Sequence, residues 1–332
     1  MNVRLKDIAD ELGLSVTTVS RALSGTGRVK KETSERVMQL ARESNYMVNS
    51  LARSLRLNDT RIIGIVVPDI SNGFFSRIIK GAQDVCFERD YMLMVCNSDE
   101  NANYEEKALR TLMENLVSGL IVASVGSCRE FFETHPVKNV PVVYIDNVPK
   151  GAKDYDLVSI DNRQAAAELT RAVLARGYRE IGMITGPLAQ SSGSMRYEGF
   201  KNALNEAGID VVADWVKEGE FSLESGYTNM LSILSLKKRP RAMLFANNKL
   251  AYGAVRAIHE IGLRIPEDMA VVSFDAYDRT GLVKPQIVSL NQPAEEIGKC
   301  AGEMIVDKLT GNITESGRRV FLDPYFTDGN SW

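Results

Sequence analysis

The sequence predicts an α/β core of two doubly wound parallel-sheet lobes, preceded by a small all-α domain. Three observations support this fold class. Short apolar segments alternate with amphipathic helical stretches over most of the 332 residues, as in parallel sheets that helices cover on both faces. This alternation starts at residue 61 and restarts near residue 156, which indicates two lobes with a cleft between them. Before residue 46 the apolar residues follow helical spacing only.

The first two helices of the N-terminal domain are separated by a tight turn. The first carries an apolar stripe at Leu5, Ile8, Ala9 and Leu12. Gly13 then offers the left-handed conformation that ends a helix, and Ser15 can cap the next one. The second helix has apolar residues at Val16, Val19, Ala22 and Leu23. Two short helices with glycine at the break form the helix-turn-helix pattern, which we favour over two ordinary helices of a larger core.

The polar face of the second helix predicts contact with DNA. It carries Thr17, Thr18 and Arg21, of which Thr17 and Arg21 lie one turn apart. At the N-terminal end of a recognition helix, arginine can pair with guanine, and threonine can touch a thymine methyl group. A third helix over residues 31–45 closes the small core with a stripe at Val37, Leu40, Ala41 and Ser44.

The charge distribution agrees with a DNA-binding N-terminal domain. The whole chain has a net charge of −3, which at first argues against a nucleic-acid partner. However, residues 1–61 contain 11 Lys and Arg against 7 Asp and Glu, whereas the rest contains 29 against 36. Only the N-terminal part is basic, as expected if it alone meets phosphates.

Two segments carry a resemblance to a known family. KDIADELGLSVTTVSRALSG at 6–25 resembles the DNA-binding head of the LacI/GalR family of bacterial repressors. NSLARSLR at 49–56 resembles the family's hinge helix, with Ala52, Arg53 and Leu55 at the family's spacing. The resemblance implies that the paired hinge helices of a dimer enter the minor groove, where the leucine wedges between base steps. A plain linker helix or a disordered tether remains the alternative, because so short a segment cannot hold a helix alone in water.

The resemblance defines the expected DNA contacts and domains. The residues assigned to DNA are Lys6, Ser15, Val16, Thr17, Thr18, Ser20, Arg21, Asn49, Ala52, Arg53, Leu55 and Arg56. The domains are a helix-turn-helix head (1–48), a hinge helix with its linker (49–60), and a core for effector binding and dimerisation (61–332). The expected partner is a pseudo-palindromic operator in double-stranded DNA, bound by a homodimer or a higher oligomer.

The core strands are expected where apolar runs end in polar residues, at 61–68, 91–97, 119–124, 141–146, 156–162, 180–186, 242–247 and 269–275. Helices are expected between them, among others at 74–88, 104–116 and 294–309. The resemblance implies a core similar to periplasmic sugar-binding proteins, in which the chain crosses three times between lobes. The lobes are then about 61–160 plus 292–323, and 161–291 plus the C-terminus.

Candidates for effector binding follow from the expected sheets. Ligands of open α/β sheets bind beyond the carboxyl ends of the strands. The resemblance adds the segment SSGSMRYEGF at 191–200 and one aromatic position in the second lobe. Together these arguments select Asn72, Phe74, Phe75, Ser124, Asp146, Arg196, Phe221, Asn248 and Asp275.

The chemistry of this set suits a polar ring such as a sugar. Arg196 is expected to act as a two-pronged donor toward a hydroxyl pair or a carboxylate. Two positions depart from the family pattern: Gly73 replaces a proline, and Asn248 replaces an aspartate, which removes one charge. Alternatives stay open, namely helix capping by the two aspartates, a core position for one of the two adjacent phenylalanines, and a surface ion pair for the arginine.

Several other classes of protein fit the sequence less well. No apolar run reaches the ~18 residues of a membrane span, and no secretion signal precedes the first helix, so a cytoplasmic protein without membrane contact is expected. Four cysteines are scattered along the chain, at Cys86, Cys96, Cys128 and Cys300. This spacing predicts free thiols in a reducing compartment. His135 and His259 lack metal-binding spacing, and no metal or cofactor is expected.

The motifs of nucleotide-binding enzymes and serine hydrolases are missing, so no enzyme is expected. A carboxylate-based carbohydrate-processing enzyme and a sugar-binding protein without a DNA-binding role remain the alternatives. The prediction is a cytoplasmic, dimeric regulator of transcription, a repressor, whose affinity for its operator depends on an effector in the cleft. We favour a sugar or a sugar acid over a purine. Whether the effector releases or promotes DNA binding stays open.

Overall fold

The computed structural model describes residues 3–24, 28–44, 46, 60–126, 131–132, 140–276 and 284–332. The chain divides into two compact units, Met1–Arg61 and Ile62–Trp332. The first unit is the helical head, and the second is the two-lobed core. The predicted hinge contacts at 49–56 lie outside the described residues.

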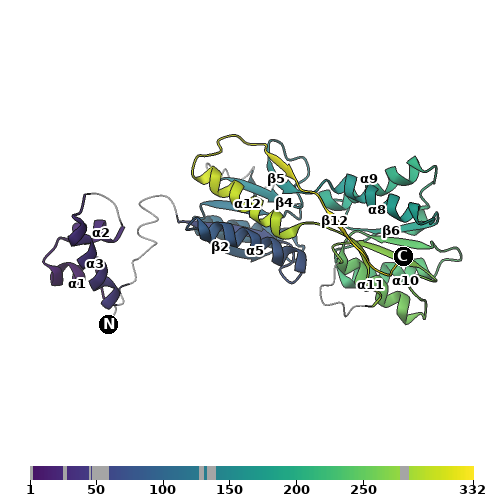
Figure 1. Cartoon of the computed structure of the whole chain (residues 1–332), viewed down its shortest axis with the longest axis horizontal. Coiled ribbons are helices and arrows are strands. Elements are labelled where there is room, and N and C mark those ends of the chain that lie inside the picture. Colours follow the sequence, from purple (N-terminus) through teal and green to yellow (C-terminus); the bar gives the residue numbers. More distant parts are fainter. Residues whose placement is uncertain are drawn as a thin grey trace. The chain divides into compact units, whose positions relative to one another are not determined.

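The head contains the three predicted helices, α1 (Leu5–Leu12), α2 (Val16–Ser24) and α3 (Lys31–Glu43) (Figure 1). The backbone N–H of Arg4 donates to the carboxylate of Asp7 at 2.7 Å, which fixes the start of α1. Gly13 ends α1 in the left-handed conformation with φ 64°. The Oγ of Ser15 accepts from the N–H of Thr18 at 3.1 Å, so Ser15 caps α2 as predicted.

The three helices enclose a small apolar core formed by Ile8, Ala9, Val19, Ala22, Val37 and Ala41. Val16, in the first turn of α2, is 43% exposed and does not join this core, which agrees with its selection as a residue that contacts DNA. An apolar side chain left in solvent on the recognition helix is free to meet another molecule.

The core unit has two six-stranded sheets, which confirms the predicted fold class. The first has the order β11-β5-β4-β3-β1-β2, and the second has the order β12-β10-β9-β8-β6-β7. The strands of the first sheet are β1 (Ile62–Val67), β2 (Met92–Asn97), β3 (Gly119–Val122), β4 (Val142–Ile145), β5 (Asp156–Ser159) and β11 (Arg319–Phe321). Those of the second are β6 (Ile181–Thr185), β7 (Val216–Glu218), β8 (Ala242–Phe245), β9 (Ala270–Phe274), β10 (Val288–Asn291) and β12 (Tyr325–Thr327).

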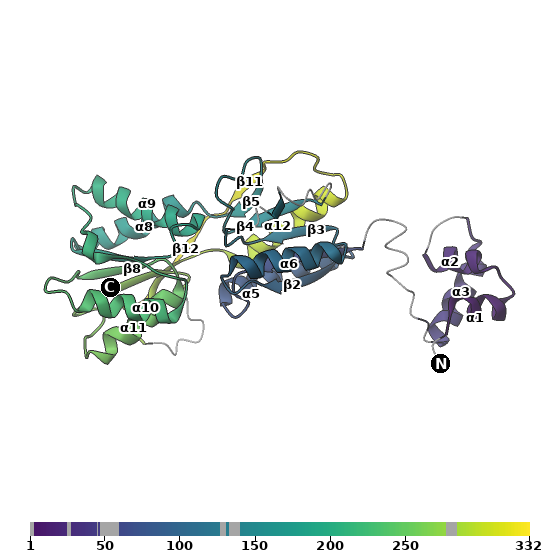
Figure 2. The ribbon, with the colours of Figure 1, turned by 180° about the vertical axis from the view of Figure 1, so that it is seen from behind.

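Helices cover both sheets (Figures 1 and 2). Those of the first lobe are α5 (Gly73–Glu88), α6 (Ala102–Glu114) and α12 (Ala294–Leu309). Those of the second lobe are α8 (Asn162–Ala175), α9 (Ser191–Glu206), the short 3-10 helix Ala213–Trp215, α10 (Leu223–Leu234) and α11 (Asn248–Glu260). All described strand pairs are parallel except β10 with β12. The central strands are buried on both faces, which explains why their apolar runs are continuous.

The chain passes between the lobes after β5, after β10 and after β11. The second crossing brings α12 back to the first lobe, where its backbone packs closely against the backbone of α5. A Cβ atom on Gly298 would lie 2.0 Å from the carbonyl oxygen of Ile78, and one on Gly81 would lie 2.1 Å from that of Glu295. Any larger side chain at either glycine would push the two helices apart.

Candidate functional site

A cavity lies between the two lobes, at the carboxyl ends of strands from both sheets. It brings together eight of the nine residues expected to bind an effector: Asn72, Phe74, Phe75, Asp146, Arg196, Phe221, Asn248 and Asp275. The lining also contains residues that the sequence analysis missed, namely Pro68, Asp69, Glu100, Asn147, Ser192, Asn247 and Gln292. The rule that ligands bind beyond the carboxyl ends of strands therefore selected residues that line one cavity.

Two aspartates occupy equivalent positions in the two lobes. Asp146 follows β4 and Asp275 follows β9, both with left-handed backbone (φ 58° and 55°) and both buried. The carboxylate of Asp275 accepts from the backbone N–H of Gln292 at 2.8 Å and from its side-chain amide at 2.9 Å. Asp146 Oδ2 accepts from the amide of Asn147 at 3.1 Å, whereas its buried Oδ1 has no partner among the described residues.

Arg196 lies between these carboxylates as a buried cation, not as a surface ion pair, with 3% of its surface exposed. Its Nε donates to the Oδ1 of Asn162 at 2.7 Å, and its Nη1 donates to the carbonyl oxygen of Ala246. The guanidinium carbon lies 4.1 Å from the ring centroid of Phe274. Only Nη2 is without a partner among the described residues. The guanidinium therefore offers a ligand one free nitrogen, not the two that were predicted.

Burial dominates the electrostatics of the cavity. It raises the pKa of Asp146 to about 6, although the nearby charge of Arg196 acts in the opposite direction and that of Asp275 in the same one. Burial also raises the pKa of Asp275. It lowers the pKa of Arg196, but a guanidinium still keeps its proton. One cation thus faces two buried carboxyl groups.

Glu100 is the most informative residue that the sequence analysis missed. It follows β2 with a left-handed backbone (φ 54°), and its Oε2 accepts from the side-chain amide of Gln190 in the other lobe at 3.0 Å. Burial raises its pKa to about 7. The signal for finding it was available, because Glu100 lies three residues beyond β2, at the same edge of the sheet as Asp146.

Ser124 is the predicted residue that the structure does not bring to the cavity. It is buried just beyond β3, and its hydroxyl is hydrogen-bonded to Glu105 Oε1 of α6 at 3.1 Å. The Oγ of Ser124 also accepts from the backbone N–H of Gly126 at 3.0 Å. Position beyond a strand did not predict this orientation, because the buried carboxylate of Glu105 draws the hydroxyl toward α6.

Direct hydrogen bonds join the lobes around the cavity. The amides of Asn72 and Asn248 donate to each other across the cleft, at 3.2 and 3.1 Å. Asp69 forms an ion pair with Lys249 of the opposite lobe. The Oδ1 of Asn147 accepts from Ser191 Oγ at 3.1 Å and from the N–H of Ser192 at 2.8 Å. The remaining space is about 30 Å³, enough for about two water molecules. A sugar ring can enter only if some of these bonds break.

Aromatic rings complete the lining. Phe74 and Phe75 meet edge to face with their centroids 4.9 Å apart, and both also belong to the apolar core of the first lobe. Phe221 comes from the second lobe and lies against Gly186, where a Cβ atom would approach its Cζ to 2.1 Å. The close fit requires glycine there.

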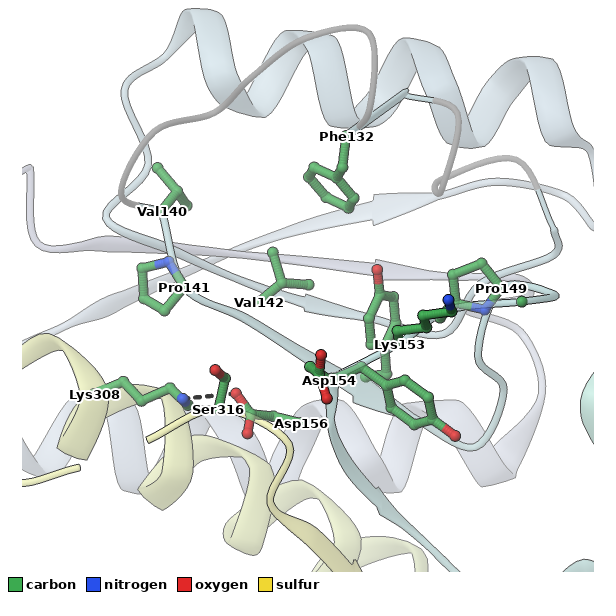
Figure 3. A pocket seen from close by; sticks show the side chains of 14 residues that line it. Phe132, Val140, Pro141, Val142, Pro149, Lys153, Asp154, Asp156, Lys308 and Ser316 are labelled. Carbon is green, nitrogen blue, oxygen red and sulfur yellow. Dashed lines mark ion pairs between the residues drawn. The ribbon is translucent and has the colours of Figure 1, made fainter. Parts of the chain in front are cut away.

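A second, larger cavity of about 580 Å³ lies in the first lobe, beside Phe132, Val142 and Pro149 (Figure 3). Lys308 and Asp156 form a buried ion pair of 2.7 Å at its wall. Each of the two side chains also has a second partner. Asp156 Oδ1 accepts from the backbone N–H of Arg318 at 2.9 Å, and Lys308 Nζ donates to the carbonyl oxygen of Glu315 at 2.6 Å. Among the described residues, unpartnered buried polar atoms occur in the interlobe cleft and not here, so size alone does not identify the binding site.

The head presents a candidate DNA-binding surface on α2. Val16, Thr17 and Arg21 are exposed on it, whereas Thr18 and Ser20 are half-buried. The hydroxyls of Ser15 and Thr18 are hydrogen-bonded to each other at 2.8 Å, so Ser15 is engaged in capping. Lys6 is exposed on α1. The predicted contacts Asn49, Ala52, Arg53, Leu55 and Arg56 lie outside the described residues.

The described part of the chain contains no group of three or more His, Cys, Asp or Glu side chains that could hold a metal ion. None of its helices combines the length and apolarity needed to cross a membrane. Cys86, Cys96 and Cys300 are free thiols whose pKa is raised by burial, whereas Cys128 and His135 lie outside the described residues.

Comparison with known proteins identifies the family of both units. Residues 60–327 match the family described as periplasmic binding proteins and sugar binding domain of LacI family. Residues 4–49 match the bacterial regulatory proteins of the lacI family. The HTH-type transcriptional repressor PurR of Photorhabdus laumondii is 33% identical, over 98% of this chain and 96% of that protein. PurR of Serratia proteamaculans is 34% identical over 94% and 92%.

Solved structures show the same fold over the full length. The Lac repressor dimer bound to operator and the anti-inducer ONPF superposes with a TM-score of 0.86 at 24% identity, covering 100% of this chain and 99% of that one. The complex of the transcriptional regulator CelR with cellobiose superposes with a TM-score of 0.74 at 26% identity, covering 100% of both. The chain belongs to the LacI family of bacterial regulatory proteins, as a DNA-binding transcriptional repressor with a ligand-binding domain.

Proposed function

We propose that this chain acts as a homodimer on a pseudo-palindromic operator, and that a small polyhydroxylated effector in the interlobe cleft controls its affinity for DNA. The observation that carries the effector is a set of three buried polar atoms without partners in the described structure: Asp146 Oδ1, Arg196 Nη2 and Gln292 Oε1. All three residues line the same cavity. Each unsatisfied group costs about 1–3 kcal/mol, so a ligand that satisfies them binds with a matching gain.

The chemistry of these atoms favours hydroxyl groups. Two of the three are acceptors and one is a donor, and a hydroxyl serves either kind. A sugar presents several hydroxyls on one rigid ring, and the related CelR structure is a complex with cellobiose. The sugar acid expected from the sequence has weaker support. Arg196 offers a ligand carboxylate only one free nitrogen, Nη2, and two buried carboxyl groups lie nearby. In this proposal the cleft binds its ligand and catalyses no reaction.

The DNA-binding part of the proposal rests on the exposed residues of α2. Two heads in a dimer would read the two half-sites, with Val16, Thr17 and Arg21 in the major groove. The hinge contacts remain predictions from the sequence, as do the dimer and the cytoplasmic location. The protein would then act where its operator is, in the bacterial cytoplasm.

A calorimetric screen of the full chain tests the effector proposal. The panel contains sugars, sugar acids and nucleobases. Asp146→Asn keeps the size of the side chain but removes the unpartnered carboxylate, and should weaken the binding of the best ligand about tenfold. Asp210→Asn, an exposed change on a loop of the same core, should leave affinity unchanged. Failure of every ligand to bind, or equal affinities for the two variants, would contradict the placement of the site.

A further inference from the structure

The interlobe cavity contains more acidic than basic groups. Asp146, Asp275 and Glu100 line it together with the single guanidinium of Arg196. Asp69, the remaining charged residue of the lining, forms an ion pair with Lys249, and the charge of Arg77, which is not part of the lining, also acts on Asp275. A neutral ligand would leave this excess of carboxyl groups in place, and an acidic ligand would increase it. A cation would offset it.

We propose that the effector carries a protonated amine, as an amino sugar does, and that Asp146 and Glu100 bind this amine. The inference rests on the proposed function of the cleft and names the chemical class of its ligand.

The geometry around Asp146 supports an incoming donor with a positive charge. Its Oδ1 is buried, lines the cavity and has no partner among the described residues. Its Oδ2 already accepts from the amide of Asn147, so Oδ1 is the carboxylate oxygen left to accept from a ligand. An ammonium group carries three donors, and its hydrogen bonds to carboxylates are about twice as strong as those between neutral groups.

The surroundings of Glu100 lead to the same conclusion. Four groups from other segments act on it most strongly: the amide of Gln190 before α9, and the carboxyl groups of Asp146 after β4, Asp69 after β1 and Glu220 after β7. The amide donates one hydrogen bond at 3.0 Å, while the three acids repel negative charge on Glu100. Burial and this repulsion together raise its pKa to about 7. A ligand ammonium would reverse the imbalance.

A metal ion is a poorer match for these carboxyl groups. Within the described ranges, no three or more carboxylate, thiol or imidazole side chains lie close enough together to hold one. Cations such as Mg²⁺ and Ca²⁺ need six or more oxygen ligands in one shell. Two carboxyl groups are enough for one ammonium group, whose three donors can be shared between them.

Calorimetry with matched sugars tests the proposal on the full chain. The set comprises glucosamine, galactosamine and mannosamine, each with its parent hexose and its uronic acid. We expect one amine to bind about tenfold more tightly than its parent, and the uronic acid to bind most weakly. A parent hexose that binds as tightly as its amine overturns the inference and leaves the sugar cleft standing. No binding by any of the nine compounds overturns both.

Variants locate the amine within the cavity. Glu100→Gln should reduce the preference for the amine over the parent hexose about tenfold, while affinity for the parent hexose changes little. Glu114→Gln is the matched control, because Glu114 is exposed on α6 of the same lobe, does not line the cavity and is not among the groups that act on Glu100. An undiminished preference in Glu100→Gln would remove Glu100 from the site.

Proton release provides an independent measurement. A bound ammonium lowers the pKa of Glu100 and Asp146, so binding at about pH 6.5 should release up to about one proton. Calorimetry in two buffers with different ionisation enthalpies counts these protons, and the parent hexose should release almost none. Proton uptake with the amine would contradict the proposed contacts.

Discussion

At the scale of single residues, Arg196 is the buried cation whose charge acts on both lobe-end aspartates. Its substitution is therefore not a simple test of ligand binding, because it also removes buried contacts. Arg196→Ala would leave Asp146 and Asp275 buried without their cation, and Asn162 and the Ala246 carbonyl without a donor. We expect the free energy of unfolding to fall by about 3–5 kcal/mol in urea titrations.

Arg163→Ala is the control for this change. Arg163 forms an exposed ion pair with Glu198 on the same lobe, and its removal should cost less than about 1 kcal/mol. Similar small losses for both variants would show that Arg196 does not support the fold.

The same carboxyl groups make stability depend on pH. Burial raises the pKa of Glu100 from 4.5 to about 7 and that of Asp146 from 3.8 to about 6. The folded state therefore retains protons that the unfolded state has lost, and stability falls as pH rises through this window. The cost is absent below the unfolded values and complete above the folded ones. Glu100→Gln should thus be more stable than the parent protein at about pH 8, by on the order of 1–3 kcal/mol, and nearly equal at about pH 4.

Thermal denaturation of the ligand-free protein across this pH range measures the effect. An equal stability difference at both ends of the range would show that Glu100 has no raised pKa. A gain in stability that accompanies a loss in ligand preference would identify Glu100 as a residue placed for binding rather than folding.

At the scale of elements, α2 combines a structural face with a reading face. Val19 and Ala22 belong to the head core, while Val16 and Thr17 are exposed in the first turn. Exchanging Val16 and Thr17 for another pair should change the preferred operator, at about 1–3 kcal/mol for each lost base contact. Selection from random duplexes measures the preference.

Ser15→Ala is the comparison for that exchange. It removes the cap of α2 and should lower the stability of the head by about 1 kcal/mol without altering which sequence is selected. An unchanged preference after the Val16 and Thr17 exchange would contradict their assignment to base contacts.

The hinge segment gives a separate prediction. If residues 49–56 act as hinge helices in the minor groove, Leu55→Ala should strongly weaken operator binding and reduce DNA bending. Non-specific binding should hardly change, because phosphate contacts supply most of it. Titrations of operator and random duplex at one salt concentration distinguish this from a passive linker. Equal losses on both duplexes, or none on either, would contradict the hinge.

The elements predicted from the sequence are those with a long periodic signal. The helix at 294–309 was predicted with the same limits as α12, because its apolar residues repeat over four turns. β11 and β12 were missed, because each has only three residues and none of these residues is buried. Their pairing depends on β5 and β10, far away in the sequence, which no local pattern contains.

The candidate site was predictable to a similar degree. The carboxyl-end rule found Asp146 and Asp275, since a strand end is visible in the sequence. It missed Gln292 because the strand before it, β10, was not predicted, and it misplaced Ser124 because Glu105 determines the direction of the hydroxyl. Position along the chain predicts which edge a residue occupies, whereas orientation depends on neighbours that only the folded structure supplies.

At the scale of the whole molecule, the candidate DNA-binding surface and the interlobe cavity belong to two separate compact units. The lobes are joined around the cavity by Asn72 with Asn248, Asp69 with Lys249 and Glu100 with Gln190. A ligand that enters must exchange some of these bonds for its own. In the proposed function, ligand binding would therefore change how the lobes meet and, through this, the affinity of the heads for DNA.

Titration of operator DNA with the full chain, with and without the tightest-binding ligand of the calorimetric screen, tests this claim most directly. The operator Kd should change by at least about fivefold at saturating ligand, in either direction. The Kd for random duplex should stay the same. Asp146→Asn should lose the change at the same ligand concentration. An operator Kd that does not move, although calorimetry shows the ligand bound in the cleft, would contradict it.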